Sequence, residues 1–164
     1  MTRYLSKVVL SFMFVVLVGC GFQLRGAANL PDSLKTMYVQ GVDLKRGLGR
    51  ELRLGLTHNG ITVIDDYQEG AAVLTILENK IERRVLSVGG DAKVSEYELF
   101  GTLNFNITDD LGQALAEAQQ VQAIRDYQFD QNQVLGKDEE ENVLREQINQ
   151  QLVQSLLRRL SVLK

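Results

Sequence analysis

The sequence predicts an α+β fold: a two-layer sandwich in which one mostly antiparallel four-stranded sheet carries two helices packed on one face. The middle of the chain, from about 73 to 130, contains three long segments in which apolar and polar residues alternate. Alternation with a period of two is typical of half-buried strands. Helical spacing of apolar residues appears before this region, at 43–59, and after it, from 138 onward. Strands that are segregated from helices in this way favour two separate layers.

A short strand is expected at 34–40, and 61–64 is a second short extended stretch. The first long strand is expected from 73 to about 88, ending in a hairpin turn at 89–91. Its predicted buried residues are Val73, Leu77, Ile81 and Val85. The second long strand shows the clearest alternation, with buried candidates Tyr97, Leu99, Leu103, Phe105 and Ile107. The third lies within 114–130, with Val121, Ala123, Tyr127 and Phe129 facing inward.

The first helix is expected from a cap at Asp43 through Asn59, with an apolar stripe of Leu44, Leu48, Leu52 and Leu56. Three glycines, at 47, 49 and 55, each weaken it by about 1 kcal/mol relative to alanine, so this helix needs tertiary support. The last helix is expected to begin with a capping box, Asp138-x-x-Glu141. Its apolar stripe is Leu144, Ile148, Leu152, Leu156, Leu160 and Leu163. With both helices on one face, the polar residues of the strands predict that the other face meets water or a polar partner.

The N-terminal segment has the pattern of an export signal. Arg3 and Lys7 precede an apolar run at 8–18, which is long enough for a signal peptide but too short to span about 30 Å of hydrocarbon as a helix. The run is followed by Leu-Val-Gly-Cys, which resembles the lipobox of bacterial lipoproteins, with Cys20 as the acylated residue. We therefore predict a lipoprotein signal peptide at 1–19 and a single domain at 20–164. A retained membrane anchor is the alternative.

Composition excludes several classes of function. Removing 1–19 from the 164 residues leaves 145, with 16 basic and 21 acidic side chains and a net charge of −5, which disfavours nucleic-acid binding. One cysteine and one histidine exclude disulfide scaffolds, thiolate zinc sites and histidine clusters. No nucleophile elbow, phosphate-binding loop or calcium loop is present. His58 is expected to have a structural or surface role at a helix end. We predict no catalytic residue, no metal and no cofactor other than the lipid on Cys20.

A basic group is the candidate binding site. Arg83 and Arg84 lie late in the first long strand, Lys93 follows the hairpin turn, and Lys137 lies between the last strand and the final helix. Hairpin topology brings these four residues to one end of the sheet, where they are expected to receive an anionic head group or phosphate. The alternative is that they are solvated surface cations paired with Glu82, Glu96 or Asp91.

The sequence contains three further motifs. The first is Gly19-Cys20-Gly21-Phe22-Gln23-Leu24-Arg25-Gly26, the second is Ser95-Glu96-Tyr97-Glu98-Leu99, and the third is Leu135-Gly136-Lys137-Asp138-Glu139-Glu140-Glu141. Together they resemble motifs of a known family, the lipopolysaccharide (LPS) assembly lipoproteins LptE, once called RlpB. The resemblance implies a non-enzymatic subunit that plugs the large β-barrel LptD, helps it assemble and binds LPS. Lys137 matches a basic position of the family that is implicated in LPS contact. Some members also carry a basic residue in the hairpin turn, where this chain has Gly89-Gly90 and would rely on Lys93.

Location follows from the general sorting pattern of lipoproteins. Gly21 in place of Asp implies the outer membrane of a Gram-negative envelope, with the domain lipid-anchored on the periplasmic side. Two or three acyl chains, each contributing roughly 0.8 kcal/mol per buried methylene, anchor a protein firmly. The alternative function is a stand-alone envelope lipoprotein that serves as a periplasmic scaffold or lipid carrier. An envelope hydrolase lacks candidate residues.

Overall fold

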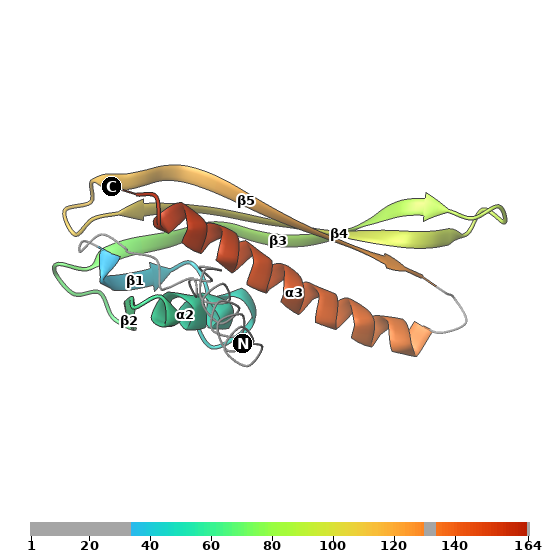
Figure 1. Cartoon of the computed structure of the whole chain (residues 1–164), viewed down its shortest axis with the longest axis horizontal. Coiled ribbons are helices and arrows are strands. Elements are labelled where there is room, and N and C mark those ends of the chain that lie inside the picture. Colours follow the sequence, from blue (N-terminus) through green and yellow to red (C-terminus); the bar gives the residue numbers. More distant parts are fainter. Residues whose placement is uncertain (1–33, 130–133, 164) are drawn as a thin grey trace, which may run out of the picture.

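The computed structural model describes residues 34–129 and 134–163, and for 134–137 only the backbone. The expected signal peptide at 1–19, Cys20 and the motif at 19–26 lie outside the described residues. The chain folds as an α+β sandwich, as predicted, with one sheet and a layer of helices (Figure 1).

Five strands form one mixed sheet in the order β2-β1-β3-β4-β5. Their bounds are β1 Thr36–Gln40, β2 Thr62–Ile64, β3 Ala72–Val88, β4 Val94–Thr108 and β5 Ala114–Gln128. The three long strands form an antiparallel meander, whereas β1 pairs in parallel with both β2 and β3. The prediction of a four-stranded, mostly antiparallel sheet is therefore wrong in its strand count and at this edge. A three-residue strand is too short for its periodicity to be recognised, and the direction of pairing at a sheet edge leaves no local pattern.

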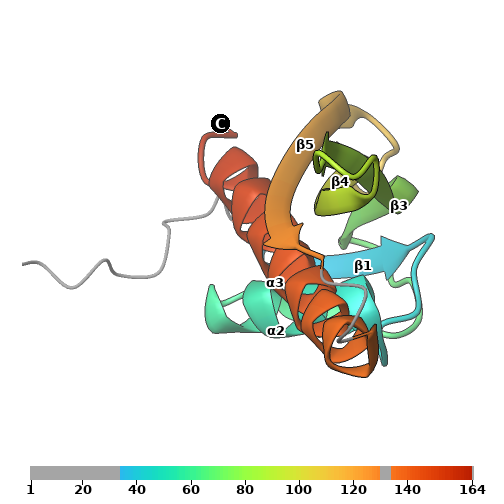
Figure 2. The same cartoon turned by 90° about the vertical axis from the view of Figure 1, so that its right-hand side faces the viewer.

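Both helices lie on the same face of the sheet, as predicted. α2 (Gly47–His58) connects β1 to β2 and lies beside those strands, while α3 (Val134–Leu160) runs diagonally along the longer strands (Figure 1). The end-on view of Figure 2 shows the two helices together on one side of the strands. The opposite face, which we call the open face, carries no helix of the described residues.

The core lies between the two layers and is almost wholly aliphatic. The predicted stripe of α3 is confirmed, since Ile148, Leu152, Leu156 and Leu160 are buried. The alternation of β4 is confirmed as well, since every second residue from Leu99 to Ile107 is buried and those between are partly exposed. The inward residues of β5 are confirmed, with Val121, Ala123 and Tyr127 buried and Phe129 packed against the core.

Two glycines permit close approaches of α3 to β4 and to α2. A Cβ atom on Gly101 of β4 would lie 2.4 Å from Ile148 Cγ2 and 3.4 Å from Leu152 Cδ1. A Cβ atom on Gly55 of α2 would lie 2.8 Å from Val153 Cγ1 of α3. The sequence predicted only that Gly55 weakens its helix, whereas in the structure it allows α2 and α3 to pack closely.

The predicted buried face of β3 is only partly right. The buried residues at the start of this strand are Ala72, Leu74 and Ile76, so Val73 and Leu77 face the other way, and Leu77 is 52% exposed. The pairing register with β4 shifts between Ile76 and Glu78, and a bulge of this kind exchanges the two faces of a strand. Beyond the bulge Ile81 packs against the core, as expected.

Both predicted helix starts differ from the structure. Asp43 accepts a hydrogen bond from the backbone N–H of Lys45 at 2.9 Å in a turn ahead of α2, and the cap position of that helix is Arg46. α3 begins at Val134, so Asp138 is not its cap. Glu141 therefore lies two turns into the helix, where its carboxylate makes tertiary contacts.

Candidate functional site

The predicted basic residues belong to one end of the molecule, which we call the hairpin end. It comprises the turn 89–93, the adjoining ends of β3, β4 and β5, and the start of α3 (Figure 1). The turn is closed by hydrogen bonds from Gly89 N–H to the Lys93 carbonyl at 2.7 Å and from Ala92 N–H to the Gly89 carbonyl at 3.0 Å. The β3–β4 hairpin extends beyond the start of α3, so its tip has no helix beneath it.

Arg83 lies on the helix face of β3 and is held within the fold. Its Nη1 lies 3.1 Å from Glu141 Oε2 on α3, and its guanidinium lies 4.7 Å from the centre of the Tyr97 ring. Tyr127 donates its hydroxyl proton to the same Glu141 oxygen at 2.6 Å, and Arg145 Nη2 donates to Glu141 Oε1, also at 2.6 Å. We call Arg83, Tyr127, Glu141 and Arg145 the Glu141 network. It connects β3, β5 and α3.

Electrostatics within the Glu141 network favour the ionised carboxylate. Burial alone would raise the pKa of Glu141, but hydrogen bonds from Tyr127 and Arg145 and the nearby positive charges outweigh it, so this pKa is lowered. The pKa of Tyr127 is raised to about 12, first by burial and then by its hydrogen bond to Glu141. Glu141 is therefore negative and Tyr127 neutral at neutral pH, and the network acts as a structural link between the layers.

Arg84 lies on the open face, because successive residues of a strand point to opposite sides. Its Nη2 lies 2.9 Å from Glu82 Oε2, and its guanidinium lies 4.0 Å from the centre of the Phe100 ring. Glu98 is at the longer distance of 3.9 Å from Arg84 Nη1. Lys80 also pairs with Glu82, at 2.5 Å. Arg84 is thus part of an exposed ion-pair cluster that crosses β3 and β4.

The two lysines have different positions at the hairpin end. Lys93 closes the turn and remains 60% exposed, with its Nζ 4.0 Å from Asp91 Oδ2. Lys137 lies in the first turn of α3, not before the helix as predicted, and its side chain lies outside the described residues.

The structure thus brings the elements of the predicted site together but does not gather its side chains into one cluster. Arg83 faces the helices, Arg84 faces the open side, and Lys93 lies in the turn between the two strands. Two ion pairs of the kind expected under the alternative are present, Arg84 with Glu82 and Lys93 with Asp91. Glu96 accepts a hydrogen bond from Ser87 at 2.7 Å instead.

The open face is polar along its length, as predicted from the strand patterns. Asn104 donates to Glu78 at 2.7 Å and Gln122 to Gln120 at 3.0 Å. The large apolar side chains on this face include Leu77 and the cross-strand neighbours Ile124 and Phe100. This surface suits contact with water or with a polar partner.

Sequence reasoning missed an apolar patch on the hairpin tip. Val85, Leu86 and Val88 are 55%, 48% and 56% exposed, although Val85 was predicted to be buried. A signal was present in the sequence, since apolar residues at consecutive positions of a strand point to both faces and a single helix layer can cover only one of them. The tip thus combines an exposed lysine with exposed aliphatic side chains.

The described residues contain no group of three or more side chains suited to holding a metal ion. Within the same residues, none of the helices has the length and apolar character needed to cross a membrane. His58 is exposed at the last position of α2, in agreement with the expected surface role.

Comparison with known proteins gives consistent matches. The model of the family described as LptE, lipopolysaccharide-assembly, matches residues 34–160. The LPS-assembly lipoprotein LptE of Photorhabdus laumondii is 28% identical over 165 residues, covering 98% of this chain and 87% of that protein.

Two solved structures with similar folds are described as lipoproteins. The solution structure of an uncharacterized lipoprotein B from Nitrosomonas europaea matches with a TM-score of 0.70 and 26% identity, covering 86% of this chain and 90% of that chain. A minor lipoprotein from Acinetobacter baumannii matches with a TM-score of 0.65 and 28% identity, covering 78% and 91%. These similarities extend over both layers of the fold.

Proposed function

Since the chain belongs to the LptE family of lipopolysaccharide-assembly lipoproteins, we propose that it occupies the lumen of an LptD-type outer-membrane β-barrel, helps that barrel assemble and binds LPS. The family is one of LPS assembly and not a family of enzymes. The proposal concerns the partner, the ligand and the location of this chain.

The polar open face is the observation that carries the proposal. A sheet face left uncovered in a two-layer protein meets either water or a partner, and here it presents carboxylates, amides and paired cations. The lumen of an outer-membrane barrel is polar and hydrated, unlike its lipid-facing exterior. A lumenal plug should therefore have a surface of this kind.

Co-purification from outer membranes tests the proposed partner. The lipoprotein, extracted in mild detergent through a C-terminal affinity tag, is expected to bring with it a large β-barrel protein in equimolar amount. The alternative is a scaffold or lipid carrier that works alone. Recovery of the lipoprotein without a barrel partner would favour this alternative and overturn the plug proposal.

The proposed LPS contact lies at the hairpin end. Lys93, Lys137 and Arg84 remain candidates for the phosphate groups, while the guanidinium of Arg83 is engaged by Glu141. The exposed Val85, Leu86 and Val88 add apolar surface on the same tip as Lys93. A cationic and aliphatic surface is chemically complementary to an anionic amphiphile.

The double substitution Lys93→Asp and Lys137→Asp is expected to weaken LPS binding by the purified protein at least tenfold while the fold persists. Its control is Arg158→Asp with Arg159→Asp, which changes the net charge equally at the other end of α3. Binding is measured by titration with fluorescent LPS, and folding by circular dichroism. If both double variants bind LPS as the wild type does, the assignment of the two lysines is wrong.

Replacing Cys20 with alanine is expected to release the protein from membranes into the periplasmic fraction, because the acyl chains are then missing. The measurement is membrane fractionation in cells depleted of the barrel, where retention by the barrel cannot mask the loss of the lipid. If the variant stays in the membrane fraction of these cells, the leader is a retained anchor.

A further inference from the structure

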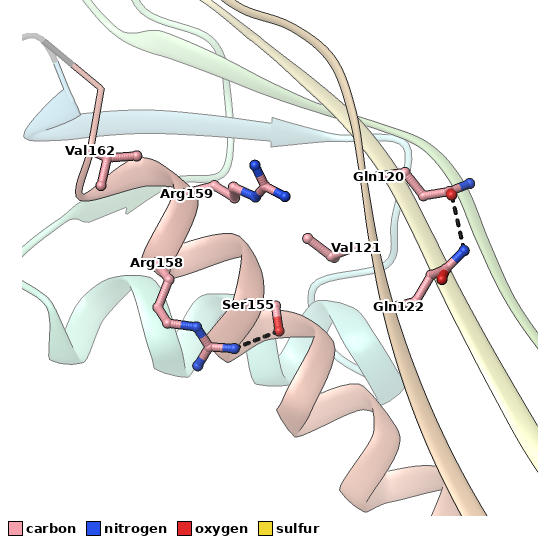
Figure 3. Close-up of a pocket in the computed structure, with 7 residues that line it drawn as sticks. All are labelled: Gln120, Val121, Gln122, Ser155, Arg158, Arg159 and Val162. Atoms are coloured by element: carbon pink, nitrogen blue, oxygen red, sulfur yellow. Dashed lines mark hydrogen bonds between the residues drawn. The ribbon is translucent and has the colours of Figure 1, made fainter.

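A groove lies at the opposite end of α3 from the hairpin end. It has a volume of about 550 Å³ and runs between the middle of β5 and the last turns of α3. Gln120, Val121 and Gln122 form one wall, and Ser155, Arg158 and Arg159 belong to the other (Figure 3). The groove is separate from the hairpin end, and of the residues cited for the open face it shares only Gln120 and Gln122.

The strand wall of the groove is the free edge of the sheet. β5 is the last strand in the order β2-β1-β3-β4-β5, so it pairs with β4 alone among the described strands. Its pairing with β4 runs without a register shift from Gln120 to Gln128, which leaves a regular row of outward-pointing backbone groups. Native edges are commonly protected by lysine, proline or a bulge, but Gln119–Gln122 is uncharged and contains none of these.

The helix wall of the groove is positively charged. Arg159 extends toward Val121, while Arg158 Nη2 donates to Ser155 Oγ at 2.8 Å (Figure 3). Both arginines are exposed, and neither forms an ion pair with an acidic side chain in the part of the chain that the structure describes. This contrasts with Arg83, Arg84 and Arg145, which all have carboxylate partners.

We propose that this groove binds an extended, acidic segment of a partner protein, which adds as a sixth strand to the free edge of β5. The backbone edge supplies the main-chain hydrogen bonds of strand addition, and every second side chain of the added strand points toward the helix layer. Carboxylates at those positions would form charge-assisted hydrogen bonds with Arg158 and Arg159. These carboxylates would be the acidic partners that the two arginines lack among the described residues. The domain has a net negative charge, but Arg158 and Arg159 make this groove locally positive. This local positive charge favours an acidic segment and determines where on the edge it binds.

Hydrogen exchange on the mature lipoprotein in detergent micelles tests the proposal. The probes are two ten-residue peptides, one alternating glutamate with valine and the other alternating lysine with valine. The acidic peptide is expected to slow exchange of the backbone amides at 118–124 at least tenfold, and the basic peptide to leave them unchanged. The edge of β2 at Thr62–Ile64 is the matched control, because it is also a free edge but is not part of this groove.

Variants test the role of charge. Arg158→Glu with Arg159→Glu is expected to raise the concentration of acidic peptide needed for half-protection at least tenfold, while Arg158→Lys with Arg159→Lys changes it less than threefold. Both residues are exposed, and thermal melting checks that each variant is folded. Because the wild type is compared with two peptides, the charge preference is measured even if the glutamate variant does not fold.

Three results would overturn the proposal. They are equal protection by the two peptides, no protection of 118–124 by the acidic peptide, and protection that rises with protein concentration in the absence of peptide. The last result would mean that a second copy of the chain occupies the edge. Co-purification with a barrel is a separate measurement, so the failure of either proposal is recognised independently of the other.

Discussion

Replacing Gly101 with valine is expected to lower the free energy of unfolding by about 3 kcal/mol, at the upper end of the cost of overpacking a core. Gly101 lies in the middle of β4, where the Ile148 methyl group of α3 would be only 2.4 Å from the added Cβ atom. Strand and helix are both fixed by neighbours, so the clash must separate the two layers. For a domain of this size the melting temperature should fall by roughly 6–12 °C.

The control for this substitution is Gly90→Val in the hairpin turn, where an added Cβ atom meets nothing within 4 Å. Its melting temperature should stay within a few degrees of the wild type. The double variant Gly101→Ala with Ile148→Ala should be more stable than the sum of its single variants predicts, because the smaller residue at 148 makes room. A stable Gly101→Val variant would show that the layers do not approach as the structure describes.

The helix–sheet approach at Gly101 illustrates what the sequence alone could predict. Apolar residues repeat at helical spacing along α3 and at every second position along β4. These repeats are long enough to identify each element and its buried face. The contact between Gly101 and Ile148 depends on how two elements lie in space, and no local pattern encodes it. The same holds for β1, whose parallel pairing with β2 depends on the crossover through α2 and whose parallel pairing with β3 depends on the connection from β2 to β3.

Replacing Glu141 with glutamine is expected to lower the free energy of unfolding by about 2 kcal/mol at pH 7, the range for hydrogen bonds to a charged group. Glu141 is only 13% exposed and accepts hydrogen bonds from Tyr127 and Arg145. Its two arginine partners are 47% and 35% exposed, so solvent screening keeps the loss below that of a fully buried ion pair. Urea denaturation measures the change.

This loss should depend on pH in a defined direction. The pKa of Glu141 is lowered in the folded state, so its contribution is complete above the ordinary value of 4.5 and disappears as the pH falls through the lowered pKa. The wild type and Glu141→Gln should therefore converge in stability in acid. At high pH the direction is opposite. The pKa of Tyr127 is raised in the folded state, so its contribution to stability is complete below pH 10 and is lost as the pH rises to about 12.

Glu139→Gln is the matched control, since Glu139 is an exposed acid on the same helix. It should change stability by less than about 0.5 kcal/mol. A difference between wild type and Glu141→Gln that persists unchanged below the lowered pKa would contradict the role given to the ionised carboxylate.

The sequence predicted that the basic residues lie at one end of the fold, but it did not predict the directions in which their side chains point. The hairpin and the return of the chain to the same end follow from the order of strands, which brings Arg83 and the start of α3 together. The bulge at Ile76–Glu78 has no signature in the sequence, so the buried face of β3 was assigned in the wrong register near its start. The motif Asp138-x-x-Glu141 predicts a helix cap, which is a local interaction. In the structure Glu141 instead contacts Tyr127 and Arg83 of the sheet.

The position of α3 as the last element has a consequence for biogenesis. If the chain is exported as proposed, it emerges from the translocase with its N-terminus first, so the strands reach the periplasm before the helix that covers them. Until α3 follows, the helix-facing side of β4 exposes Leu99, Leu103 and Phe105. Nascent intermediates with such surfaces aggregate unless they are bound. Under the proposed export, we therefore expect a premature stop before Ile148 to yield an aggregation-prone product that is removed by proteolysis.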